Sequence, residues 1–254
     1  MESIRHPEQL YIEPFVGAAN VIAHMSGNRK AYDAHPDLIL MWNALKQGWR
    51  PPDFVTPELH ASLRHAEPSA LRAFVGFGCS FGGKFFGGYA RSSKERNFAA
   101  SAIRSLDRKM VTLRDVTFER GYFHELEPKG ALIYCDPPYA GTASFSVGKF
   151  DHGRFWEKVR EWSRENTVIV SECSAPEDFS VVKTITAPCG LRRADGSQKP
   201  RNEFLFQFSE SIGKAAVPEG KLKPSRSSYV RHSVKDCSPA CRKRSEKRCK
   251  TRTR

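Results

Sequence analysis

The chain has 254 residues, of which 39% are hydrophobic and 11% aromatic, so it can form one sizeable domain with a buried core. It has no run of about 18 apolar residues, and its first residues lack the basic-then-apolar layout of a secretory signal. We therefore expect neither a membrane span nor export. The odd number of seven cysteines favours the reduced thiols of a cytosol over a disulfide framework.

The positive charge is concentrated near the carboxyl end. Residues 211–254 hold 14 Lys and Arg against three Asp and Glu, so they carry eleven of the thirteen net positive charges. We expect this Ser-, Pro- and Lys-rich segment to be a disordered tail, which could bind nucleic acid through its phosphates. A zinc site in the tail is disfavoured, because Cys237, Cys241 and Cys249 lack the paired spacing of zinc ligands.

Before the tail, short apolar runs alternate with helical patterns. The predicted helices cover residues 36–48, which start near a proline and stop at a glycine, and residues 150–166. The predicted strands are 10–14, 30–34, 111–115, 131–136, 167–173 and 203–208. Of these, 111–115, 131–136 and 167–173 have the β-rich, apolar pattern of buried parallel strands. This alternation predicts an α/β domain with a parallel sheet.

Residues 51–110 interrupt the alternation. Short helices are predicted first, followed by "GFGCSFGGKFFGGYAR" at 76–91, which is dense in glycine and aromatic residues, and then by a long helix over 93–110. We interpret this block as an insertion or a small second domain.

The stretch "YIEPFVGAANVI" at 11–22 predicts a strand, a tight Phe-x-Gly turn and the start of a helix. The loop after the first strand of an α/β sheet borders the ligand crevice, where Gly17 would let a ligand approach the backbone and helical N–H groups would face it. A plain tight turn is the alternative. Asp33 follows the second strand, where nucleotide-binding folds place the acid that holds ribose hydroxyls, although a helix N-cap is also possible.

The stretch "YCDPPYAG" at 134–141 places a polar, rigid corner directly after an apolar strand. Asp136 would point into the ligand crevice, and the prolines leave carbonyls free because proline has no N–H. A carboxylate and a fixed carbonyl are two acceptors that suit an amino group, and the Tyr139 ring could stack on an aromatic ring. Together these groups suit the exocyclic amine of a nucleobase.

"EPFVG" and "DPPY", in this order and separated by an insertion, resemble the motifs of the Dam-like DNA adenine methyltransferases, which use S-adenosylmethionine. "GFGCSFGGKFFGGYAR", "IYCDPPYAGT", "FDHGRFW" and "VIVSECSAPEDF" look like phage and prophage members of that group, and the likeness covers roughly residues 10–208. The resemblance implies a Rossmann-like methyltransferase sheet formed by 1–50 and 111–210, a target-recognition insertion at 51–110 and the basic tail at 211–254. It also implies a phage-encoded enzyme of the bacterial cytoplasm.

The resemblance further implies roles for individual residues. The cofactor, S-adenosylmethionine, would contact Pro14, Phe15, Gly17, Asp33, Thr117 and Asp136. Asp136 and the carbonyl of Pro137 would hold the adenine amine, Pro138 would fix the turn, and Tyr139 would stack on the flipped base. Double-stranded DNA would be the partner, contacted by Lys84, Tyr89 and Arg91 of the insertion. No metal is implied, and flipping is required because the amine is out of reach inside a duplex.

Two departures from the family pattern are visible. Relatives have an aspartate before a phenylalanine after the strand that we place at 111–115, whereas Phe118 is preceded here by Thr117, with Asp115 two residues earlier. Relatives also carry a Gly-Ser-Lys or Gly-Gly-Lys segment upstream of the Phe-x-Gly turn, and the residues before that turn do not match it. Two alternatives stay open. One is methylation of a cytosine or RNA amine, although cytosine enzymes more often have serine where Asp136 stands. The other is a catalytically impaired prophage remnant that binds nucleic acid, which the unmatched upstream segment and the unusual tail support.

Overall fold

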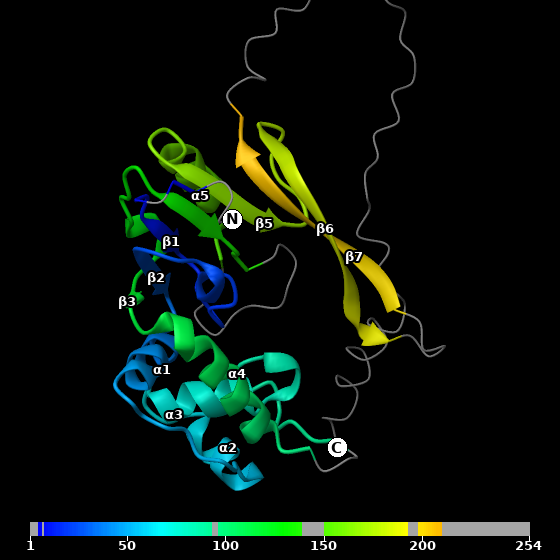
Figure 1. Ribbon diagram of the computed structural model, residues 1–254. Helices are drawn as coiled ribbons and strands as arrows, with labels where there is room; N and C mark the ends of the chain where they lie inside the picture. The colour runs from blue at the N-terminus through cyan, green and yellow to red at the C-terminus, as the bar shows by residue number, and fades with distance from the viewer. Residues whose placement is uncertain (1–4, 7, 93–95, 139–149, 193–197, 210–254) are drawn as a thin grey trace, which may run out of the picture. The chain divides into compact units, whose positions relative to one another are not determined.

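The computed structural model describes residues 5–6, 8–92, 96–138, 150–192 and 198–209. These residues form a seven-stranded sheet with the order β3-β2-β1-β4-β5-β7-β6 (Figure 1). The strands are β1 (Tyr11–Glu13), β2 (Arg29–Asp33), β3 (Thr117–Arg120), β4 (Leu132–Cys135), β5 (Thr167–Glu172), β6 (Phe179–Arg192) and β7 (Gln198–Phe208). β1 to β5 run parallel to one another, and β7 lies antiparallel between β5 and β6.

The strand order reverses at the pair β1 and β4, because β2 and β3 extend from one side of β1 and β4 and β5 from the other. Ligands of open α/β sheets bind at the carboxyl ends of the strands beside such a switch point. The predicted fold class is confirmed as far as the arrangement of the elements goes: an α/β domain with a Rossmann-like sheet and a helical insertion.

Successive residues of the central strands contribute to two different cores. Tyr11 and Tyr134 belong to one core, and Ile12 and Cys135, their neighbours in sequence, belong to the other. This alternation is expected of strands buried on both faces. α1 (Pro36–Lys46) packs into the first core and α5 (His152–Trp162) into the second, so the two helices cover opposite faces of the sheet.

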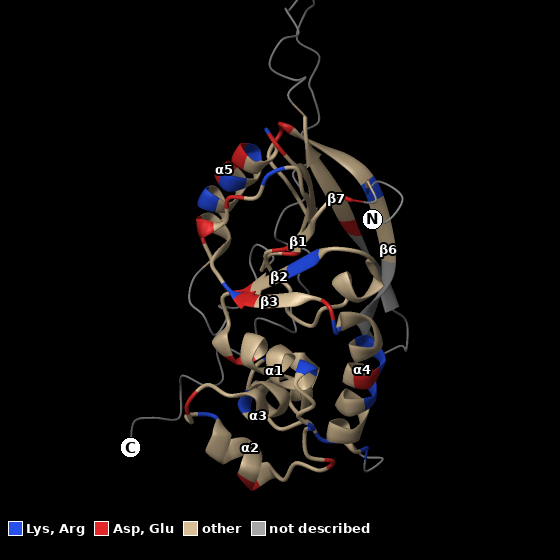
Figure 2. Ribbon diagram, turned by 60° about the vertical axis from the view of Figure 1, so that its left-hand side comes forward, with Lys and Arg blue, Asp and Glu red and all other residues tan. Residues whose placement is uncertain are grey.

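The helices begin where the sequence supplies N-terminal caps. The Asp151 carboxylate accepts a hydrogen bond from Arg154 N at 3.0 Å at the start of α5, and Asn97 caps α4 (Phe98–Leu113) through Ala100 N at 3.0 Å. Figure 2 shows acidic and basic residues along α5, as expected of a helix with one buried face.

The helical insertion packs against the same core as α1. It contains α2 (Pro57–Leu63), α3 (Ala70–Ala73), the short helices η3 (Phe74–Gly78) and η4 (Phe81–Gly83), and α4. The glycine-rich segment forms a small hairpin, in which Phe81 N donates to Gly88 O at 2.8 Å and Ala90 N to Cys79 O at 2.9 Å. Gly76 is needed for close packing, because a Cβ there would lie 2.4 Å from the Phe85 ring.

The predicted strand at 111–115 is wrong. Residues 111–113 end α4, and β3 begins only at Thr117. The run has β-branched residues, but Leu106, Met110 and Leu113 continue the apolar face of the helix, and Val111 is 76% exposed. The helical period therefore overrides the local strand propensity.

The sequence also predicted a helix directly after Gly17, and this is wrong as well. The chain forms a tight turn there, with positive φ at Gly17 (44°) and Ala19 (54°), and the only helical segment described before β2 is the three-residue η2 (Ile22–His24). Two left-handed residues in three cannot continue a right-handed helix. The row of helical N–H groups expected to face a ligand is therefore absent from residues 17–21.

β6 was not predicted. In the described sheet β6 pairs only with β7. Val181 and Val182 are about half exposed, so β6 lacks the apolar pattern by which a buried strand is predicted. Pro188 is tolerated because an edge strand leaves N–H positions unpaired. No helix among the described residues is long and apolar enough to cross a membrane. The tail at 211–254 lies outside the described residues.

Candidate active site

The carboxyl ends of three neighbouring strands bring three acidic residues to one edge of the sheet. Glu13 ends β1, Asp33 ends β2, and Asp136 follows β4 directly. β1 lies between the other two strands and runs parallel to both. This edge therefore holds the two acids predicted from the sequence, Asp33 and Asp136, and Glu13, which was not predicted.

The turn after β1 is held by contacts from two other elements. Gly17 N donates to the Asp33 carboxylate at 2.9 Å, and Gly17 O accepts from Trp42 Nε1 of α1 at 3.0 Å. Val16 N donates to the carbonyl of Tyr32 at 2.9 Å. A Cβ on Gly17 would meet no atom within 4 Å, so the space beside its backbone is open. The turn is fixed and leaves room for a ligand.

Asp33 organises this edge through both carboxylate oxygens. One accepts from Gly17 N and the other from His35 N, each at 2.9 Å. Burial raises the pKa of Asp33, and the two N–H groups act against that rise. Each oxygen has a second lone pair, so the carboxylate can still accept hydrogen bonds from a ligand. The described structure gives no side-chain N-cap for α1, which removes the alternative N-cap role of Asp33.

Glu13 is 3% exposed and is the group that sequence reasoning missed. Its carboxyl accepts a hydrogen bond from the Tyr11 hydroxyl at 2.8 Å. Burial raises the pKa of Glu13 to about 8; hydrogen bonds from Tyr11 and Ile22 N oppose the rise, and the charge of Asp136 adds to it. Glu13 is thus mostly protonated at neutral pH. The only sequence signal was an acid at the end of an apolar strand.

Glu13→Gln is expected to change how stability depends on pH. The carboxyl keeps its proton up to about pH 8 in the folded chain but loses it near pH 4.5 when unfolded. Wild-type stability should therefore fall as pH rises from 4.5 to 8, because the unfolded state binds fewer protons in that window. Gln cannot titrate. Urea unfolding at pH 5, 6.5 and 8 should show the variant gaining on wild type with pH, and parallel curves would contradict a buried neutral Glu13.

The structure describes three residues of the corner after β4, and their predicted contact with an amine stays a prediction. Asp136 is exposed, Pro137 is buried and Pro138 is half-buried. The buried Cys135 anchors the strand immediately before them. The corner thus presents a carboxylate on rigid backbone. Tyr139, predicted to stack on a base, lies outside the described residues.

Pro14 and Phe15 lie between β1 and the turn. Pro14 is buried, and the half-buried Phe15 ring packs 5.6 Å from Phe123 and 5.7 Å from Phe155, centroid to centroid. Phe15 therefore fixes the turn to the core beneath the sheet. The predicted contact of these two residues with a cofactor stays a prediction.

Thr117 lies apart from the other proposed cofactor residues. It is the first residue of β3 and so lies at the amino end of that strand, whereas Asp33 lies at the carboxyl end of the parallel neighbour β2. β3 ends at Arg120, and the first phenylalanine after it is Phe123, preceded by Tyr122. Gly121 N donates to Asp33 O at 3.2 Å, which brings this segment beside Asp33. With the strand placed correctly, Tyr122 and Phe123 follow its carboxyl end.

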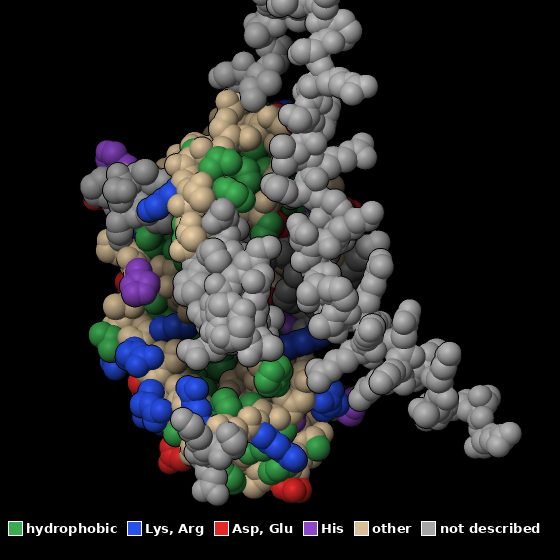
Figure 3. Space-filling view, turned by 90° about the vertical axis from the view of Figure 1, so that its right-hand side faces the viewer, with side chains coloured by type: hydrophobic (Ala, Val, Ile, Leu, Met, Phe, Trp, Pro, Cys, Tyr) green, Lys and Arg blue, Asp and Glu red, His purple; other side chains and the backbone are tan. Residues whose placement is uncertain are grey.

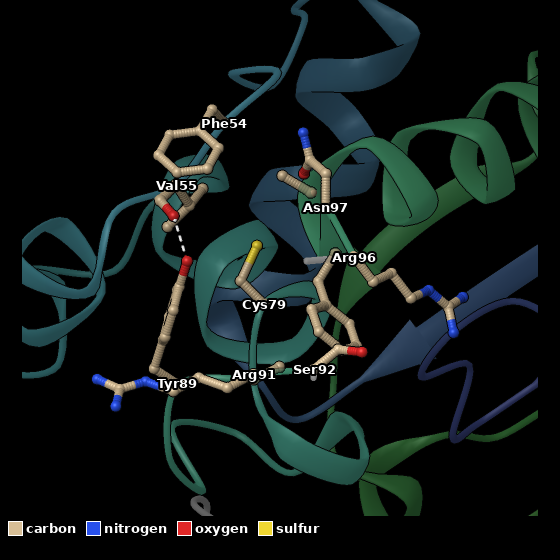
Figure 4. A pocket seen from close by; sticks show the side chains of 11 residues that line it. Phe54, Val55, Cys79, Tyr89, Arg91, Ser92, Arg96 and Asn97 are labelled. Atoms are coloured by element: carbon tan, nitrogen blue, oxygen red, sulfur yellow. Dashed lines mark hydrogen bonds between the residues drawn. The ribbon is translucent and has the colours of Figure 1, made fainter. Parts of the chain in front are cut away.

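Lys84, Tyr89 and Arg91 belong to the glycine-rich hairpin or directly follow it, away from the acidic edge in sequence. Lys84 and Arg91 are exposed, whereas the Tyr89 hydroxyl is bound to the Val55 carbonyl at 2.8 Å. Figure 3 shows Lys and Arg side chains gathered over the helical part of the chain. Tyr89, Arg91, Arg96 and Phe54 line a hollow of about 380 Å³, and Arg91 and Arg96 extend on different sides of it (Figure 4).

The described residues contain no group of three or more His, Cys, Asp or Glu side chains that could hold a metal ion. The acidic edge offers the carboxyl groups of Glu13, Asp33 and Asp136 as hydrogen-bonding groups.

Comparisons with known proteins found distant structural likenesses only. No family model matches the chain, and no curated protein matches its sequence. An rRNA methylase from Streptococcus thermophilus superposes with a TM-score of 0.37 and 7% identity, covering 82% of this chain and 92% of that one. The rRNA methyltransferase AviRa from Streptomyces viridochromogenes gives a TM-score of 0.35 and 10% identity, with 80% and 78% covered. Scores of this size carry no weight for function, which has to be inferred from the residues of this chain.

Proposed function

We propose that the chain is an S-adenosylmethionine-dependent DNA methyltransferase that acts on the exocyclic amine of adenine. The observation that carries the proposal is the Asp136-Pro137-Pro138 corner at the end of β4, next to the Gly17 turn and Asp33 at the switch point of the sheet. Hydrogen-bond acceptors suited to an amine and residues suited to a nucleoside thus lie at the same edge of the sheet.

The residues at the ends of β1 and β2 fit the adenosine part of that cofactor. Asp33 retains acceptor capacity for a ribose diol, and the open space beside Gly17 allows the ligand to approach the backbone. The segment 121–123, tied to Asp33 through Gly121 N, would border the adenine ring. When bound, the cofactor supplies an electrophilic methyl group on a sulfonium.

The corner after β4 would bind the nucleophile. The Asp136 carboxylate and the Pro137 carbonyl each accept one N–H of the amine, which directs the nitrogen lone pair away from them. As the nitrogen forms its new bond it gains positive charge, and the carboxylate stabilises that charge and then takes the released proton, directly or through water. The pKa of Glu13 is raised to about 8, so Glu13 is mostly protonated at neutral pH, and Asp136 is the acid that we assign to the amine.

The helical insertion would bind the nucleic acid. Lys84 and Arg91 are exposed on or beside the hairpin, and Arg104 and Arg108 are exposed one turn apart on α4. Such groups bind phosphates and position a duplex without reading its sequence. The target base would have to leave the stack to reach Asp136. The positive charge of residues 211–254 would add nonspecific affinity.

The proposal is tested by incubating the purified full chain with methyl-labelled cofactor and unmethylated double-stranded DNA, single-stranded DNA or RNA. The DNA is then digested to nucleosides and separated by mass. N6-methyladenine in DNA is the expected product, and its absence from the Asp136→Ala reaction is the control.

The other outcomes separate the alternatives. Label in RNA alone, or in N4-methylcytosine, would keep the chemistry and replace the substrate. Nucleic-acid binding without label in any polymer would overturn the enzyme proposal in favour of an impaired remnant.

A further inference from the structure

Lys109 reaches from α4 to the segment that follows the Gly17 turn. Its ammonium donates hydrogen bonds to the carbonyl of Ala18 at 2.6 Å and to the side-chain oxygen of Asn20 at 2.7 Å. The side chain is half-buried, whereas the neighbouring Arg108 is exposed. A residue 89 or more positions away in sequence therefore places a cation beside the turn at the end of β1.

This cation is not neutralised by the part of the chain that the structure describes. Both partners of Lys109 are neutral oxygens, and none of the described ion pairs includes it. An ammonium has three N–H donors, so one remains after the two bonds to the 18–20 segment. Burial lowers the pKa of Lys109, with a further contribution from Arg108, as expected of a cation that lacks an anionic partner. A ligand anion would supply that partner.

The order of the strands indicates which anion this is. On the proposed function, ribose lies at Asp33 after β2 and the reacting amine at Asp136 after β4. β1 lies between these two strands. A sulfonium carries three substituents: the adenosyl group directed to β2, the methyl group directed to β4, and an amino-acid chain that is left to the segment after β1. That segment is the one that Lys109 holds.

We propose that Lys109 is the cation that binds the carboxylate of the amino-acid part of the cofactor. The proposal rests on the proposed function, because it presumes that the cofactor binds at this edge. Lys109 would contact the carboxylate through its third N–H while its other two donors fix residues 18–20, so one side chain both shapes the turn and neutralises the ligand.

The simpler explanation is that Lys109 only holds the turn in place. Two ligands separate the two roles. S-adenosylhomocysteine carries the carboxylate, whereas 5′-methylthioadenosine has the same adenosine and thioether without the amino-acid group. Loss of a turn contact weakens both ligands, but loss of a carboxylate contact weakens the first alone.

The test is calorimetric titration of the full chain with each ligand, for wild type, Lys109→Gln and Arg108→Gln. Gln at 109 keeps two N–H donors for the turn but removes the charge. We expect Lys109→Gln to bind S-adenosylhomocysteine about 10- to 100-fold more weakly, the range for losing one charge-assisted contact. Its affinity for 5′-methylthioadenosine should stay within about twofold of wild type. Arg108→Gln, which changes the adjacent exposed cation, should alter neither affinity.

Three results would overturn the proposal. Unchanged affinity of Lys109→Gln for S-adenosylhomocysteine would show that the charge is not used. An equal loss for both ligands would assign Lys109 to positioning of the turn alone. If wild type binds neither ligand while it melts cooperatively, the cofactor assignment itself fails, and this inference fails with it.

Discussion

Asp136→Ala should lower the rate of methyl transfer to DNA by at least about 100-fold, while the affinity for S-adenosylhomocysteine changes far less. The size follows from removing one preorganised polar group that faces charge formed in the transition state. Asp136 is exposed, so the fold should survive the change. Single-turnover rates at saturating cofactor, with calorimetry on the same preparation, measure the two effects separately.

Asp136→Asn and Glu67→Ala make this measurement specific. Asn keeps one oxygen acceptor but loses the charge, so its rate should fall between those of wild type and Asp136→Ala. Glu67 is an exposed acid of the helical insertion, and its removal should leave the rate unchanged. Near-full turnover by Asp136→Ala would show that the corner after β4 does not hold the reacting amine.

The strands that build this edge were predictable because short strand-like runs alternate with helical patterns in the sequence. Residues 10–14, 30–34, 131–136 and 167–173 were predicted as strands, and the structure has β1, β2, β4 and β5 there. Once the strands are parallel, the acids that follow them must share one edge. Asp33 and Asp136 could therefore be placed together without a structure.

Glu13 and Lys109 could not be found in this way. Whether an acid at a strand end is charged depends on how completely the neighbouring elements cover it, and Glu13 is covered on all sides. Lys109 matters only because α4 passes beside residues 18–20, a contact between segments far apart in the sequence. Local patterns carry no information on either property.

Because β3 was predicted at the wrong residues, the choice of Thr117 as a cofactor contact was affected as well. Assigning the strand to 111–115 made Thr117 the expected cofactor contact, although it lies at the amino end of β3. The apolar face of α4 continues to Leu113, so the helix continues to that residue. The strand therefore begins only after the following turn, at Thr117. Tyr122 and Phe123 follow the true strand end, and whether they border a cofactor stays a prediction.

Asp33→Ala should weaken S-adenosylhomocysteine binding by about 100-fold or more and also destabilise the fold. The carboxylate would lose its contacts with the ribose diol, each worth about 1.5–3 kcal/mol for a charged acceptor. The same change removes the acceptor of two backbone N–H groups, on Gly17 and His35, which should cost about 1–3 kcal/mol of stability. Calorimetry gives the first effect and urea unfolding the second.

A control must show that weaker binding is not a consequence of lower stability. Asp37 is likewise a buried acid, and its shortest contacts, Arg72 Nη1 at 2.7 Å and Ser69 N at 2.9 Å, come from the α3 region, with His35 Nδ1 farther away at 3.5 Å. Asp37→Ala should therefore lose comparable or greater stability, because it leaves a partly buried arginine unpaired, yet keep most of its ligand affinity. If both variants lose affinity in proportion to their stability, Asp33 acts on the ligand only through the fold. A loss confined to Asp33→Ala places the ribose at the end of β2, and with it the sulfonium between β2 and β4, where a methyl group can face Asp136.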